Sequence, residues 1–150
     1  MTNPFHRPLR CALKPLVAAL LLGAAIHACA ADLVVIVSAR SPVTTMRADQ
    51  VANIFLGQVA NFPGGGQAVA LDQQVGSDQR NTFYAKVAAK TPALIKAYWS
   101  KMIFTGRGQP PNAVATSAVV RKMVAENQNL VGYIDRSALD ASVKVVLVVH

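Results

Sequence analysis

The sequence predicts an α/β domain in which a mixed β-sheet is flanked by helices. Runs rich in β-branched and aliphatic residues, such as 33–37 and 143–149, indicate strands, and the continuous run 33–37 indicates a strand that is buried on both faces. Between such runs lie amphipathic segments that carry helix caps. Because helices alternate with buried strands, we expect a largely parallel or mixed sheet whose faces are covered by the helices.

The first 30 residues predict a cleavable secretory signal peptide, which leaves 31–150 as one domain. The start of this segment carries basic residues and no acid, namely Arg7, Arg10 and Lys14. An apolar run over 16–26 follows, and then a small-x-small cleavage site at 28–30. The apolar run is too short to cross a bilayer core of about 30 Å as a helix. We therefore expect export to the periplasm.

Two alternatives to simple cleavage stay open. The segment can remain as an uncleaved membrane anchor, or Cys29 can be lipidated. The lipoprotein pattern needs small residues just before the cysteine, and His27 fits that pattern poorly.

Cleavage after Ala30 changes the chemistry that the chain can support. It removes both cysteines, so the mature domain has no disulfide and no thiol nucleophile, and its only histidine is the C-terminal His150. These losses argue against a Ser-His-Asp triad and against a histidine-rich zinc site. The seven acidic residues show no spacing that marks a catalytic pair. We expect no enzyme activity, no metal and no cofactor.

The charge of the chain indicates the kind of partner. Cleavage removes three basic residues and no acidic one, so the formal net charge falls from +8 to +5. A basic exported domain is suited to anionic solutes, acidic polymers or lipid headgroups. Its basic residues are scattered along the chain, and nucleic acid is not an expected partner of an exported protein.

The first half of the domain is expected to contain two strands and one helix. The run 33–37 predicts the first strand. Thr45 is expected to cap a helix that ends at Gly57, where glycine suits the residue after a helix. The glycine-rich segment 61–66 predicts a loop or hairpin tip, since no Lys-Ser/Thr follows it as in a phosphate-binding P-loop. The run 68–71 predicts the second strand, followed by a polar loop over 72–76.

Two helices are expected next. Ser77 is expected to cap one of them, and Thr91 followed by proline to cap the other. The second of these helices carries a stripe of apolar side chains that we expect to pack against the sheet, with Trp99 at its centre. The segment 105–111, rich in glycine and proline, cannot continue the helix and predicts an ordered loop.

The last third predicts one helix and two strands. Thr116 or Ser117 is expected to cap the helix, which ends near 127–129. The run 130–134 predicts a strand in which a glycine allows another backbone to approach closely. The run 143–149 predicts the final strand.

Two segments are candidate anion sites. A helix start at Ser77, with Gln79 and Arg80 in its first turn, offers free backbone N–H groups and a positive dipole end. The alternative is simple capping, in which Ser77 binds the backbone N–H of Arg80. The second candidate is the glycine-flanked pair Thr105 and Arg107, because arginine can bind an oxyanion through two hydrogen bonds.

Three stretches together resemble a known family. The stretch 53–57 resembles the Ile-Phe-x-Gly at the end of a helix in the phosphate-binding family of periplasmic solute-binding proteins. The stretch 72–83 is similar to that family's ligand-binding loop and helix start, and 130–134 to its Ile-Gly-Tyr strand. The resemblance covers nearly all of 33–149 and implies a single lobe of a periplasmic binding protein-like fold.

The same resemblance implies phosphate as the ligand, although two features depart from the family pattern. That family binds phosphate partly through a Ser-Gly-Thr helix start, usually preceded by an arginine. Ser77 matches the serine, but Asp78 and Gln79 stand in place of the glycine and threonine, and Asp72 lies near the position of the arginine. Family members also have two lobes that close on the ligand, and this chain supplies about one.

Two functions follow from these observations. The first is an exported solute-binding-like protein that recognises phosphate or another small oxyanion for an ABC-type transport or sensing system. The second is an envelope interaction module that reuses one lobe without binding a solute. In both cases a membrane transporter or sensor is an expected partner. A homodimer is a further candidate, since one lobe alone leaves part of a ligand exposed.

We predict that the mature protein begins at Ala31, because the small-x-small site ends at Ala30. Intact-mass measurement of the protein recovered from the periplasm tests this directly. A product that retains Met1, or one that begins far from Ala31, would contradict the signal-peptide interpretation.

Overall fold

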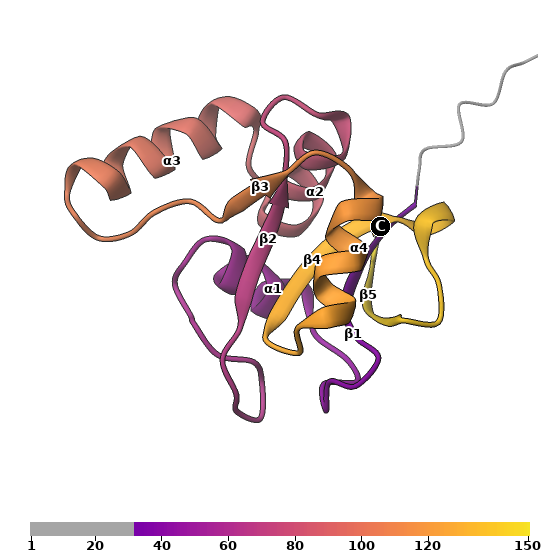
Figure 1. Cartoon of the computed structure of the whole chain (residues 1–150). Coiled ribbons are helices and arrows are strands. Elements are labelled where there is room, and N and C mark those ends of the chain that lie inside the picture. Colours follow the sequence, from indigo (N-terminus) through magenta and orange to yellow (C-terminus); the bar gives the residue numbers. More distant parts are fainter. Residues whose placement is uncertain (1–31) are drawn as a thin grey trace, which may run out of the picture.

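A five-stranded mixed sheet forms the centre of the protein, as the computed structural model of residues 32–150 shows (Figure 1). The predicted signal peptide lies outside the residues that the structure describes. The strands are β1 (Leu33–Ser38), β2 (Val69–Gln73), β3 (Asn112–Val114), β4 (Leu130–Asp135) and β5 (Val143–Val149). Their order in the sheet is β3-β2-β4-β1-β5. Strand β2 runs parallel to β3 and β4, whereas β1 runs antiparallel to β4 and β5. The predicted fold class is confirmed.

Four helices and one 3₁₀ turn accompany the sheet. They are α1 (Ala48–Phe55), α2 (Asp78–Ala88), α3 (Pro92–Phe104), α4 (Ser117–Glu126) and the turn η1 (Arg136–Ala138). Helix α4 covers one face of the sheet, α1 and α2 lie on the other, and α3 extends away from the body (Figure 1). Within the part of the chain that the structure describes, no helix is long and apolar enough to span a membrane.

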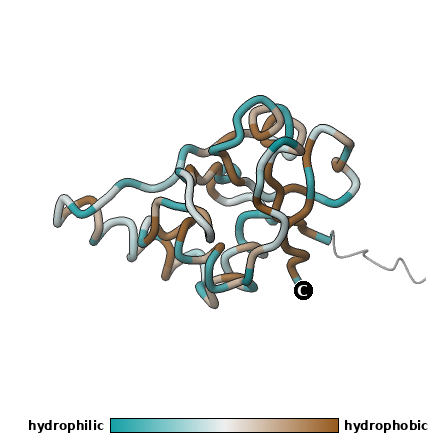
Figure 2. Tube along the Cα trace, turned by 90° about the horizontal axis from the view of Figure 1, so that it is seen from below, coloured by the Kyte–Doolittle hydropathy of each residue, from teal (hydrophilic) through white to brown (hydrophobic). Residues whose placement is uncertain are grey.

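Alternating side chains of β1 divide the core between the two faces. Val35 and Val37 pack in the cluster that contains Phe55 of α1. Val34 and Ile36 pack in a second cluster, formed with residues of α4. Such two-sided burial is why β1 is a continuous apolar run. Figure 2 shows hydrophobic stretches running through the body while hydrophilic stretches lie on the loops outside it.

Three of the predicted helix caps are confirmed. The side chains of Ser77, Thr91 and Thr116 accept hydrogen bonds from backbone N–H groups in the first turns of α2, α3 and α4. Each bond satisfies an N–H group that has no partner within its own helix.

The predicted start of the first helix at Thr45 is wrong. The N-cap of α1 is Arg47, whose backbone N–H donates to the side chain of Gln50 at 2.9 Å. Residue Met46 donates its backbone N–H to Val146 of β5 at 2.9 Å. This bond holds the chain extended as far as residue 46, so the helix begins only after it.

The structure also corrects the chain between the second strand and the fourth helix. Strand β2 continues through Asp72 and Gln73, which were expected to lie in a polar loop, and both side chains are buried. The short strand β3 was not predicted. Its pairing with β2, where Leu71 faces Asn112, defines it as a strand.

Helix α3 packs differently from the sequence expectation. Trp99 is buried, but its indole ring lies against the chain after α1, with Cη2 3.4 Å from where a Cβ would stand on Gly57. Gly57 has a φ of +66°, which glycine adopts without strain. No other part of the described chain packs over the outer end of α3. The side chains of Ile103 and Phe104 there are 47% and 92% exposed. The apolar stripe therefore packs against α2 and the chain after α1, and its outer end is exposed.

We predict that Gly132→Ala destabilises the protein by about 1–3 kcal/mol, the usual cost of overpacking a core. A Cβ at Gly132 of β4 would clash with Val120 of α4, whose branched side chain is stiff. Urea denaturation measures the change. The double variant with Val120→Ala should lose less stability than the two single variants added together, because the second change makes room for the first. Full additivity would contradict this close contact.

Candidate functional site

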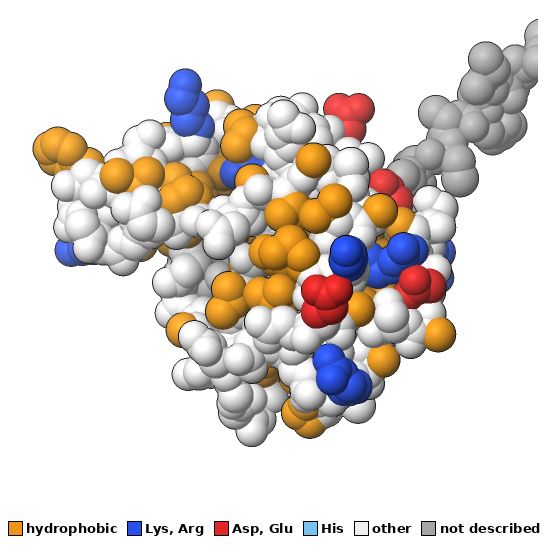
Figure 3. Space-filling view, viewed as in Figure 1, with side chains coloured by type: hydrophobic (Ala, Val, Ile, Leu, Met, Phe, Trp, Pro, Cys, Tyr) orange, Lys and Arg blue, Asp and Glu red, His pale blue; other side chains and the backbone are white. Residues whose placement is uncertain are grey.

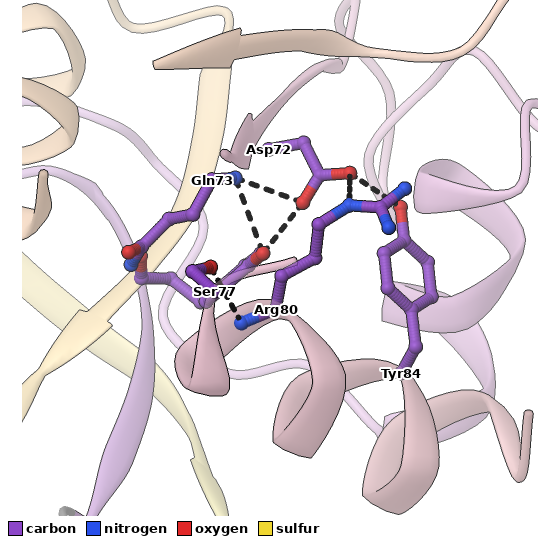
Figure 4. A network of polar contacts seen from close by, with 6 residues as sticks. Asp72, Gln73, Ser77, Arg80 and Tyr84 are labelled. Carbon is purple, nitrogen blue, oxygen red and sulfur yellow. Dashed lines mark hydrogen bonds and ion pairs between the residues drawn. The ribbon is translucent and has the colours of Figure 1, made fainter. Parts of the chain in front are cut away.

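A buried carboxylate at the end of β2, Asp72, is the centre of a polar network (Figure 4). Its Oδ2 accepts hydrogen bonds from Arg80 Nε at 2.9 Å and from the Tyr84 hydroxyl at 3.0 Å. Its Oδ1 accepts from the backbone N–H of Gln73 at 2.8 Å and from the Tyr133 hydroxyl at 2.5 Å. Asp72 is 1% exposed. These four donors replace the water that a charged group loses on burial.

Aromatic packing holds the two tyrosine donors in place. Tyr133 of β4 stacks on Phe83 with ring centroids 3.9 Å apart, and Phe83 meets Tyr84 edge-on at 5.3 Å. Burial raises the pKa of both tyrosine hydroxyls, and the negative charge of Asp72 and the hydrogen bonds to it raise the pKa further. Both hydroxyls therefore stay protonated and donate to Asp72 across the physiological pH range.

Arg80 of α2 uses only part of its guanidinium group within the network. Its Nε pairs with Asp72, and its Cζ lies 5.0 Å from the centre of the Tyr84 ring. Its terminal nitrogens make no hydrogen bond within residues 32–150. The buried side-chain atoms left without a partner in that range are Trp99 Nε1 and Asp135 Oδ1. Since only Nε of Arg80 pairs with Asp72, its terminal nitrogens keep their donors available within the part of the chain that the structure describes.

The burial of Arg80 also changes what a substitution there can show. Its side chain is 8% exposed and that of Asp72 is 2% exposed. We expect Arg80→Ala to destabilise the fold as well as to remove the guanidinium group, because the change leaves the buried charge of Asp72 without its partner, at a typical cost of about 3–5 kcal/mol.

A hollow of about 460 Å³ lies between the start of α2 and one face of α3. Arg80 and Asn81 contribute to the wall from α2. Lys96, Trp99 and Ser100 contribute from α3. The hollow therefore places a fixed guanidinium group and a flexible ammonium group on opposite walls of one space.

The other residues predicted for the first anion site make contacts within the protein. The Ser77 Oγ accepts the backbone N–H of Arg80 at 3.3 Å, which is the capping arrangement. The Gln79 side chain donates to Asp135 Oδ2 at 3.3 Å, and this oxygen also accepts from the Ser117 hydroxyl at 3.1 Å. A carboxylate of the protein thus lies beside the starts of α2 and α4, where the helix dipoles would otherwise favour a bound anion.

The second predicted group lies elsewhere. Thr105 and Arg107 are exposed at the outer end of α3, and the Thr105 hydroxyl donates to the backbone carbonyl of Lys101 at 2.8 Å. The structure does not bring this pair together with Ser77, Gln79 and Arg80.

Sequence reasoning missed several members of the site. It assigned no role to Tyr84, Tyr133 or Lys96, and it considered Asp72 only as a departure from a family pattern. The available signal was an acid directly after an apolar strand with an arginine eight residues later. Among residues 32–150, no group of three His, Cys, Asp or Glu side chains could hold a metal ion.

Comparison with solved structures gives several of similar fold. One is an ABC-type phosphate transport receptor from Vibrio cholerae, with 19% identity and a TM-score of 0.61 over 77% of this chain and 45% of that chain. Another, described as a phosphate ABC transporter substrate-binding protein, comes from Clostridium perfringens and was solved with bound phosphate. It has 27% identity and a TM-score of 0.58 over 77% of this chain and 44% of that chain. A third is PstS from Borrelia burgdorferi, with 13% identity and a TM-score of 0.55 over 77% of this chain and 46% of that chain.

These matches confirm the predicted resemblance in fold. The chain spans less than half the length of each of these three proteins. No protein-family model matches the sequence. No curated protein matches it either.

We predict that Tyr133→Phe destabilises the protein by about 1.5–3 kcal/mol near pH 8, because it removes a hydrogen bond to a charged group. The raised pKa of Tyr133 means that the folded state holds this proton more firmly than the unfolded chain. The resulting stability is present below the unfolded value of about 10 and is lost as the pH rises above it. The stability gap between wild type and variant should therefore shrink between pH 9 and 11.

Urea denaturation at several pH values measures this gap. Tyr98→Phe is the matched control, since the Tyr98 hydroxyl donates to the uncharged carbonyl of Leu56 at 2.7 Å. It should cost only about 0.5–1.5 kcal/mol near pH 8. An equal cost for both variants would show that the charge of Asp72 does not strengthen the bond from Tyr133.

Proposed function

We propose that this protein is an exported solute-binding-like domain that recognises a small oxyanion through Arg80, as part of an ABC-type transport or sensing system. The observation that carries the proposal is that only one nitrogen of the Arg80 guanidinium group is bonded within the described part of the protein. Its Nε is anchored on Asp72, its terminal nitrogens make no hydrogen bond within residues 32–150, and the Arg80 side chain lines the hollow between α2 and α3. Guanidinium groups are well suited to oxyanions, since parallel N–H donors match two oxygen atoms.

The comparisons support the class of this proposal. The similar structures are transport receptors and substrate-binding proteins rather than enzymes, and one was solved with phosphate. Their likeness to this chain favours binding over catalysis and favours the periplasm as its location. A membrane transporter or sensor is the partner that this role requires.

Affinity in such a site depends on how much of the ligand is covered. Tight small-molecule sites bury about 70–90% of the ligand surface. Here the hollow is open to solvent, and each hydrogen bond to an exposed anion nets about 1 kcal/mol or somewhat more. Three or four such contacts correspond to a Kd between about 1 mM and tens of µM. A homodimer or a partner protein that covers the hollow would tighten binding.

We predict weak, saturable binding of phosphate or sulfate in isothermal titration calorimetry, with a Kd in that range. Arg80→Lys can keep the ion pair with Asp72 but lacks the terminal nitrogens, so it should weaken binding about ten-fold or more, which corresponds to roughly 1.4 kcal/mol. Lys86→Gln, on the same helix and outside the hollow, is the matched control for lost charge.

Three results would contradict the proposal. They are the absence of saturable heat with either anion, equal binding by Arg80→Lys and wild type, and an equal loss of binding in Lys86→Gln. Submicromolar binding by a demonstrated monomer would contradict the open hollow as the site.

The second candidate function, an envelope interaction module without a solute, is favoured by the outer end of α3. Phe104 is 92% exposed there, and hydrophobic side chains are visible at the end of the projecting helix (Figure 3). An exposed aromatic residue at the end of an arm is suited to a partner's pocket. The two functions differ in the titration above, because only the first gives saturable binding of an anion.

A further inference from the structure

We infer that the oxyanion recognised here is carried by an organic molecule with a flat apolar body, and that this body lies in the hollow between α2 and α3. The inference rests on the proposed function, since it takes Arg80 as the anion-binding group. It adds the class of solute: an aromatic or similarly planar carboxylate or phosphate monoester rather than inorganic phosphate.

Size is the first reason. The hollow has a volume of about 460 Å³, within the range of about 300–1,000 Å³ that is typical of small-molecule sites. A tetrahedral oxyanion has five heavy atoms and fills only a small part of such a space. A ligand that uses the whole hollow therefore needs a body beyond its charged group.

The chemistry of the walls is the second reason. One face of α3 lines the hollow at helical spacing, with Pro92, Trp99 and Ile103 along it. Val75 and Pro110 complete the apolar wall from the loops before α2 and β3. An inorganic dianion gains little from these surfaces, because it must give up water without finding enough donors. A planar apolar body gains from them, since it removes the exposed side chains of Val75, Pro92 and Ile103 from water.

The polar groups lie where the charged end of such a ligand would bind. Arg80 lines the hollow and its guanidinium group can supply paired donors, and Lys96 adds a second positive charge from the facing helix. Asn81 and Ser100 also contribute to the lining. An apolar cavity with a few fixed polar groups is the usual composition of a site for an organic ligand.

The chain offers a direct optical test, because Trp99 is its only tryptophan and lies in the wall of the hollow. Three probes separate the contributions: phenyl phosphate carries both charge and ring, inorganic phosphate carries only the charge, and benzyl alcohol carries only the ring. We expect phenyl phosphate to change the Trp99 emission with saturation and to bind at least about ten-fold more tightly than either of the other probes.

Two variants of α3 locate the ligand. Ala93 lines the hollow, so Ala93→Leu narrows it and should weaken phenyl phosphate binding about ten-fold or more. Ala97→Leu makes the same change at an exposed position of the same helix outside the hollow and should leave binding unchanged. Both are favourable helix substitutions, and circular dichroism checks that both variants are folded.

The outcomes separate this inference from the proposed function. Equal affinity for phenyl phosphate and inorganic phosphate, with saturation by both, would overturn the organic body and leave the proposed anion role standing. Unchanged phenyl phosphate binding in Ala93→Leu would overturn the location. Equal binding of benzyl alcohol and phenyl phosphate, or binding by none of the three probes, would overturn both the inference and the proposed function.

Discussion

The buried charge of Asp72 is the constraint on which the centre of this structure depends. A carboxylate at this depth is tolerated only if hydrogen bonds replace its hydration. Its four donors come from β2 itself, from two positions of α2 and from β4. Those bonds join parallel neighbours of the sheet to the helix that covers them. The charge therefore fixes how α2 lies on the sheet, in addition to the apolar packing around it.

The same constraint shapes the candidate site. Because Arg80 neutralises Asp72 through Nε, its side chain is held in one direction, and its terminal nitrogens are not used in that ion pair. A guanidinium group held in this way loses little side-chain entropy when it binds an anion. The facing helix α3 is held less firmly, since it packs on α2 and the chain after α1 while its outer end is exposed. The site thus combines a fixed wall on α2 with a wall on α3 that is only partly supported.

The elements set by local sequence could be predicted, and those set by long-range contacts could not. The caps at Ser77, Thr91 and Thr116 and the apolar strands appear as residue types at fixed spacing, and they lie where the sequence places them. The late start of α1 depends on a backbone bond between Met46 and Val146, 100 positions apart. Strand β3 has three residues and exists only through pairing with β2. The network at Asp72 joins it to Tyr133, 61 positions away, so local pattern identified Arg80 as a candidate but could not identify Tyr133 as a donor to the same carboxylate.

The central claim is that Asp72 anchors Arg80 through its Nε–H and leaves the rest of the guanidinium group free. Hydrogen exchange of arginine Nε–H groups, followed by ¹⁵N NMR, measures this for each side chain. The account predicts that the Arg80 Nε–H exchanges far more slowly than that of the exposed Arg107, and that the terminal N–H groups of Arg80 exchange faster than its own Nε–H. Equal exchange of the Arg80 and Arg107 Nε–H groups would show that the buried pair does not exist and would contradict the account.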